Sequence, residues 1–244
     1  MNFNQVIKKL KESRPVFHSE DDLKLAMAWV IKELYPYYHV RLEKPIDISM
    51  KVKNSGEIIA RAPIDIVVID PKSKNAYPIE IKYKTKKAVL ISADETFSLA
   101  NHGANDVGRY SFRKDIYRIE NVNFENYSVN QGFVFILTND KGYYQNDVST
   151  KNSLDANFSF HHGAIVEADF IGWNYNKLPE NTYYYDNFLP LKSSLKKHWT
   201  ASKEYVFHLV LTKNYNIHWN DYSNFELDNG KIEDFKYCLI QIER

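Results

Sequence analysis

Two strand-like segments joined by a short turn constrain this chain more than any other feature. Residues 57–69 end in IDIVVI, which is rich in β-branched side chains, and residues 77–83 alternate apolar with polar ones. The intervening DPKSKN, residues 70–75, has the Pro, Ser and Asn that favour a chain reversal. The pattern predicts an antiparallel hairpin whose first arm is a buried central strand.

Charged residues interrupt both arms of this hairpin. Asp65 stands within the first apolar arm, and period-two alternation puts Glu80, Lys82 and Lys84 on one face of the second. Each of these residues costs strand stability if its face is buried. A register that aligns the arms brings Asp65 beside Glu80, so the pattern indicates a functional site.

One helix is expected before the hairpin in the sequence and another after it, which gives an α/β order of elements. Residues 19–34 begin with a serine suited to N-capping, and three acids follow it in the first turn. Residues 102–121 place apolar side chains at helical spacing beside a charged face. Further strands are expected over 39–48 and 132–138.

The second half of the chain is aromatic and polar. Its short apolar runs, such as 205–211 and 235–242, are expected to be strands. No internal repeat, low-complexity tail or Gly-, Ser- or Pro-rich linker divides the sequence. We therefore expect one domain over 1–244, with a core at about 15–140 and a β-rich extension at about 141–244.

Composition narrows the classes of function. The 244 residues, of which 44% are hydrophobic, can bury a full core. Lys and Arg number 32 against 31 Asp and Glu, so a nucleic acid would need a local basic surface. The single cysteine cannot form an internal disulfide, and the chain shows no membrane-length apolar run, secretory signal, zinc module or Gly-rich phosphate loop. We expect a cytoplasmic protein.

Two acids and a lysine at one point of a sheet have a definite chemistry. Asp65 and Glu80 offer the hard oxygen ligands that Mg²⁺ prefers, and Lys82 would lie beside a metal-bound water. Such an ion polarises a phosphoryl oxygen and lowers the pKa of its water. The acid-x-Lys tripeptide alone is common, since it occurs at three other places here. Only Glu80–Lys82 follows an acid-bearing strand across a short turn.

This ordered set resembles the PD-(D/E)xK nuclease superfamily, the fold shared by many restriction and repair endonucleases. Pro63 and Asp65 match the first half of the motif, although Ile64 separates them, and Glu80-x-Lys82 matches the second. The resemblance implies a restriction-endonuclease-like mixed central β-sheet flanked by helices, Mg²⁺ or Mn²⁺ dependence, and cleavage of DNA.

The resemblance extends beyond the motif. Glu20 matches an acid that the preceding helix often contributes in this superfamily, although the positive end of the helix dipole explains an acid there equally well. The backbone carbonyl of Ile81 is a further expected metal ligand. FHSEDDLKLAMAW, IEIKYKT and HGANDVGRYSFRKDI are similar to segments of an uncharacterised bacterial group within the superfamily.

Four residues near the expected site are candidates for binding nucleic acid. Lys84 continues the basic row beyond the site, and His102, Arg109 and Arg113 lie on the charged face of the following helix. Arginine pairs with phosphate in a directional way that lysine does not. A solvated helix face with internal ion pairs explains the same pattern.

Other polar and aromatic features receive structural interpretations. His161 and His162 are adjacent, so strand geometry would turn them to opposite faces, and we expect them to be structural. The aromatics of 183–185 and 218–222 could stack on unpaired bases, but such residues more often cover a sheet.

The expected function is metal-dependent hydrolysis of DNA, in restriction, phage defence or repair. Asp65, Glu80, Lys82 and Glu20 are the expected catalytic residues. The alternative is a non-catalytic nucleic-acid or protein binding module that keeps the nuclease fold. The sequence does not separate RNA from DNA, and a homodimer would make cutting of both strands easiest.

Overall fold

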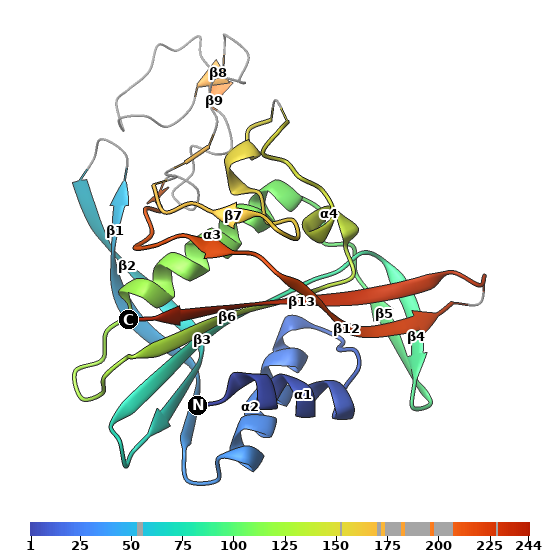
Figure 1. The fold of residues 1–244 in the computed structure, drawn as a ribbon, viewed down its shortest axis with the longest axis horizontal. Helices are drawn as coiled ribbons and strands as arrows, with labels where there is room; N and C mark the ends of the chain where they lie inside the picture. The colour runs from blue at the N-terminus through green and yellow to red at the C-terminus, as the bar shows by residue number, and fades with distance from the viewer. Residues whose placement is uncertain are drawn as a thin grey trace.

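A mixed seven-stranded sheet forms the centre of the fold (Figure 1). The computed structural model describes residues 1–52, 56–151, 153–169, 172–173, 182–183, 196–197, 207–227 and 229–244. The sheet contains β1 (His39–Val52), β2 (Gly56–Asp70), β3 (Asn75–Lys84), β6 (Gln131–Thr138), β10 (Phe207–His208), β12 (Trp219–Glu226) and β13 (Ile232–Glu243). Its strand order is β10-β1-β2-β3-β6-β13-β12, in which β3 and β6 are parallel and the other described pairs are antiparallel.

Helices cover both faces of this sheet (Figure 1). One face carries α1 (Phe3–Ser13) and α2 (Glu20–Leu34), and the other carries α3 (Asn105–Asn121). The fold is therefore of the mixed α/β class that the sequence predicts. Among the described residues, no helix is long and apolar enough to cross a membrane.

The remaining described elements are short. They are β4 (Ala88–Ser92), β5 (Glu95–Leu99), α4 (Lys141–Tyr144), the 3-10 helix η1 (Ala156–Phe158), β7 (Ile165–Val166), β8 (Thr182–Tyr183), β9 (Lys196–Lys197) and β11 (Tyr215–Asn216). The β4–β5 hairpin lies in the connection between β3 and α3, whereas α4, η1 and β7 follow β6.

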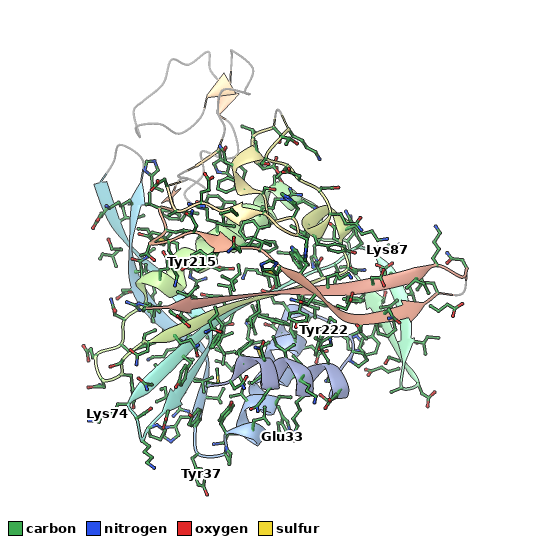
Figure 2. The ribbon with its side chains drawn as sticks, in the orientation of Figure 1. Glu33, Tyr37, Lys74, Lys87, Tyr215 and Tyr222 are labelled. Atoms are coloured by element: carbon green, nitrogen blue, oxygen red, sulfur yellow. The ribbon has the colours of Figure 1, made fainter. Side chains whose placement is uncertain are left out.

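Each face of the sheet has its own apolar core. Alternation along β3 sends Ile79 and Ile81 to the α1–α2 side, while Val67 of β2 packs on the α3 side. Figure 2 shows Tyr222 and Tyr215 on these opposite sides of the sheet. Burying an aliphatic side chain such as Ile79 or Val67 contributes about 1.5–3 kcal/mol to the stability of the fold. The two cores therefore hold both layers of helices against the sheet.

Helix α2 begins where the sequence predicts. The hydroxyl of Ser19 accepts a hydrogen bond from the Asp22 N–H at 3.1 Å and caps the helix. The buried stripe includes Leu23 and Met27. The cap and the stripe together fix Glu20 in the first turn, next to the sheet.

Helix α3 begins at Asn105, three residues later than predicted. The reason lies at His102, whose N–H donates to the carbonyl of Thr85 at 2.7 Å and whose Nδ1 accepts the Thr85 N–H at 3.0 Å. This segment is therefore bound to the end of β3. Within the helix, Gly108 allows close approach, because an added Cβ would lie 2.9 Å from two ring carbons of Tyr143.

Segments from the second half of the chain extend the same sheet. The apolar run at 235–242 belongs to β13, which lies between β6 and β12. At the opposite edge, the described part of the run at 205–211 contributes the short strand β10. Segments from the second half therefore form both edges of the sheet.

Candidate functional site

The pairing of β2 with β3 ends where Asp65 meets Glu80. The last paired residues are Ile66 and Ile79, so one further step in register puts the two acids opposite each other. Asp65 Oδ2 accepts a hydrogen bond from the Ile81 N–H at 2.8 Å. Glu80 is close enough to influence the pKa of Asp65, and Asp65 to influence that of Glu80. The hairpin thus brings one acid from each arm to a single point.

Asp65 is held from the α2 side by Lys24. Lys24 Nζ lies 3.1 Å from Asp65 Oδ1 and also contacts the carboxylate of Glu43. Glu43 has a positive φ of 50° and lies opposite Asp65 in the β1–β2 ladder, which it interrupts locally. Burial alone would raise the pKa of Asp65, but Lys82 and the Ile81 N–H outweigh burial and hold that pKa below its usual value. Asp65 is therefore ionised at neutral pH.

Glu80 is held from the opposite face by α3. Its Oε1 lies 3.0 Å from Arg118 Nη2, and the residue is only 1% exposed. Burial, reinforced by Asp115, raises the pKa of Glu80 well above its usual value despite this arginine. Asp65 and Glu80 are thus neighbouring acids whose pKa values are driven apart by their surroundings.

Lys82 stands beside the two acids and is itself oriented by carboxylates. Its Nζ lies 3.2 Å from Asp115 Oδ2 and 3.9 Å from Glu20 Oε1, and it donates to the Ile81 carbonyl at 2.9 Å. Burial would lower the pKa of Lys82, but Asp115 and Glu20 outweigh burial and raise it above the usual value. Lys82 is therefore a fixed positive charge and not a general base.

Glu20 forms the rim of the site. Its Oε2 accepts the backbone N–H of Tyr83 at 2.8 Å, which joins the first turn of α2 to β3. The side chain of Glu20 is 34% exposed, against 14% for Lys82 and 1% for Glu80. Glu20 is therefore the most solvent-exposed of these three side chains.

The oxygen atoms of the site suit a hard divalent cation. Asp65, Glu80 and the Ile81 carbonyl supply only oxygen donors, which is the chemistry Mg²⁺ selects. In the described part of the chain, no donor meets hydrogen-bond geometry at the buried Glu80 Oε1. Among the residues that the structure describes, no three His, Cys, Asp or Glu side chains group as a metal site. The groups that would hold such an ion are therefore two carboxylates and one backbone carbonyl.

Two of the predicted nucleic-acid contacts lie at the margin of this site. Lys84 is half-buried, and its ammonium has no carboxylate within 4.0 Å among the residues that the structure describes. His102 is exposed; burial of its ring and the nearby Lys84 lower its pKa, while Glu20 acts in the opposite direction. Both residues are thus placed where a backbone phosphate could approach.

The structure corrects the expectation of a solvent-facing arginine pair on α3. Arg109 is 4% exposed and pairs with Asp155 at 2.7 Å, and Arg113 is 1% exposed and donates to the Leu209 carbonyl at 2.9 Å. Their partners come from the second half of the chain. These guanidinium groups hold that half against α3, and no phosphate contact is assigned to them.

The two adjacent histidines have structural partners. His162 Nδ1 accepts the Trp219 N–H at 3.1 Å, and His161 Nδ1 lies 2.8 Å from the Ser159 hydroxyl. Trp219 and Tyr222 are buried against the sheet. The predicted aromatic cluster at 183–185 lies outside the described side chains.

Four charged residues of the site were not anticipated from the sequence: Lys24, Glu43, Asp115 and Arg118. For Asp115 a signal exists, because it shares the apolar stripe of α3 with Phe112 and Ile119. An acid in such a stripe is either paired or functional. Arg118 follows Asp115 by three residues, which is close enough for the two side chains to interact.

Comparison with known proteins does not extend these observations. No protein-family model matches the chain, and neither the curated proteins nor the solved structures contain a significant match. The function is therefore argued from the geometry and charge of the site.

Proposed function

We propose that this protein is a metal-dependent nuclease that hydrolyses DNA phosphodiester bonds and has a restriction-endonuclease-like fold. The observation that carries the proposal is the convergence of Asp65, Glu80 and Lys82 at the end of the β2–β3 pairing. The antiparallel β1–β2–β3 strands, followed by β6 parallel to β3, agree with the mixed sheet that the PD-(D/E)xK resemblance implies. A cytoplasmic location and a homodimer for cutting both strands belong to the same proposal.

Each residue has a distinct role in the proposed reaction. Asp65, Glu80 and the Ile81 carbonyl would hold Mg²⁺ or Mn²⁺, which supplies positive charge to the phosphate and makes bound water more acidic. Lys82, kept protonated by Asp115 and Glu20, orients the attacking water and stabilises negative charge that develops on the phosphate. Glu20 is the acid with access to solvent and can accept a hydrogen bond from that water.

A second candidate function is a binding module that keeps the fold without cutting. The observation that favours it is that Lys24 and Arg118 already neutralise Asp65 and Glu80. A site whose carboxylates are already paired with cationic side chains is stable without a metal ion. The two candidates therefore differ in whether a divalent cation can replace those internal cations.

Incubation of plasmid DNA with the purified protein separates the candidates. Metal-dependent cutting by the wild type that is lost in Lys82→Ala supports the nuclease. Cutting by neither protein, with DNA binding retained, supports the binding module. Equal cutting by both proteins indicates a contaminating nuclease and removes the support for catalysis at this site. A parallel RNA substrate decides which nucleic acid is cleaved.

A further inference from the structure

The two acids of the candidate site each hold a cation from a different helix. Lys24 of α2 reaches Asp65 at 3.1 Å, and Arg118 of α3 reaches Glu80 at 3.0 Å. Because α2 and α3 pack on opposite faces of the sheet, the acids are neutralised from both sides. A divalent cation bound by the two acids must share them with these cations or displace them.

Lys24 and Arg118 have different remaining partners if Asp65 or Glu80 moves away from them. Lys24 keeps the carboxylates of Asp21, at 3.2 Å, and Glu43. Arg118 keeps Asp115, whose Oδ1 is already 3.5 Å from Arg118 Nη1, and the Pro63 carbonyl. Each cation therefore has an alternative partner within reach, which lowers the cost of releasing the acid.

Of the two acids, Glu80 depends more strongly on its cationic partner. Its side chain is 1% exposed, and Arg118 supplies the one cationic group within 4.0 Å of its carboxylate among the described residues. Loss of the partner of a buried charge is strongly destabilising, because the remaining charge is left without compensation. The ionised form of Glu80 therefore requires a cation, either from α3 or from solution.

We propose that Arg118 is a positioning residue that competes with the divalent cation for Glu80. Without metal it pairs with Glu80; when the ion binds, Arg118 passes to Asp115, which also holds Lys82. The inference rests on the proposed metal-dependent function. It assigns to α3 a control of metal affinity that lies outside the PD-(D/E)xK motif.

The variant Arg118→Met tests this competition, with Mn²⁺ and Mg²⁺ as probes. It removes the guanidinium and keeps an unbranched apolar chain. In EDTA its melting temperature should fall below that of the wild type. In calorimetry its Kd for Mn²⁺ should be about tenfold tighter, because the ion no longer displaces a competitor. The rise in melting temperature with Mn²⁺ should then exceed that of the wild type.

Two control variants distinguish competition from simple loss of packing. Arg118→Lys keeps a cation and should retain an Mn²⁺ affinity closer to that of the wild type. Arg109→Met removes another buried arginine of α3, which pairs with Asp155 and not with Glu80. It should lower the melting temperature without tightening Mn²⁺ binding.

The outcomes separate this inference from the proposed function. If the wild type binds Mn²⁺ and Arg118→Met binds it equally or more weakly, the competition is overturned and the nuclease proposal stands. If neither protein binds a divalent cation, both are overturned. If Arg118→Met is unfolded in EDTA, recovery of its circular dichroism by Mn²⁺ supports competition, and no recovery overturns it.

Discussion

Asp115 Oδ2 lies 3.2 Å from Lys82 Nζ, so a buried acid of α3 orients the lysine of the candidate site. The same carboxyl group reaches Arg118 through its other oxygen, at 3.5 Å. One side chain thus connects the lysine with the arginine that neutralises Glu80. The helix after the hairpin is part of the site and does more than cover the sheet.

Replacing Asp115 with Asn should slow cleavage. Asn keeps the shape but not the charge, so Lys82 loses its strongest electrostatic partner. We expect kcat to fall about tenfold with little change in KM, because misplacing a charge that acts on the transition state affects mainly the chemical step. Steady-state cleavage of a labelled duplex measures both parameters.

Glu120→Gln provides the matched control on the same helix. Glu120 is also buried, but it accepts hydrogen bonds from Thr212 and Tyr215, away from Lys82. The control should lose stability without losing kcat. Equal losses of kcat in Asp115→Asn and Glu120→Gln would assign Asp115 a purely structural role.

Lys84→Ala should weaken DNA binding in a salt-dependent way. Lys84 shares the face of β3 with Glu80 and Lys82, and its ammonium has no carboxylate partner within 4.0 Å in the described parts of the chain. Removing one phosphate contact should reduce the slope of log K against log salt by about 0.9. Fluorescence anisotropy in EDTA measures that slope without cleavage. Lys72→Ala, in the turn at the far end of the hairpin, should leave the slope unchanged.

Arg109→Met should unfold the protein more readily and leave its DNA affinity unchanged. The Arg109–Asp155 pair is buried, and breaking such a pair costs about 3–5 kcal/mol because an uncompensated charge remains. Urea denaturation measures the change in the free energy of unfolding. A loss of DNA affinity at unchanged stability would restore the nucleic-acid role that the sequence suggested.

Cys238 should resist thiol reagents until the protein unfolds. Burial raises the pKa of its thiol from 9.0 to about 12, so the native chain holds almost no thiolate at pH 8. Labelling should be slow in buffer and fast in full denaturant. Rapid native labelling would contradict the position of Cys238 within β13.

The raised pKa of the Cys238 thiol also predicts how the free energy of unfolding changes at alkaline pH. The folded state keeps the Cys238 proton up to a higher pH than the unfolded state, so this contribution to stability is present below pH 9.0 and is lost between pH 9.0 and about 12. Cys238→Ala should therefore show a smaller decline in the free energy of unfolding over that range.

The sequence predicts those parts of the fold that local patterns determine. The β-branched run before Asp70, the alternation along β3 and the serine cap of α2 each act within a few residues, and each appears in the structure. The register that aligns Asp65 with Glu80 is compatible with the short turn that the sequence predicts.

Contacts between distant segments lie beyond such patterns. Arg109 and Arg113 are buried by Asp155 and Leu209, which are 46 and 96 residues away along the chain. The spacing of charged residues along a helix is the same whether that face is exposed to solvent or covered by distant polar segments. For the same reason, the cations on Asp65 and Glu80 become recognisable only once both helices are packed on the sheet.

The position of β13 between β6 and β12 has a consequence for the biogenesis of the protein. Until the last strand has been synthesised, β6 is an open edge with unpaired backbone groups beside an apolar surface. Such edges pair readily with other chains. A nascent or prematurely terminated chain that lacks β13 should therefore aggregate or require a chaperone, even though every residue of the candidate site has already been made.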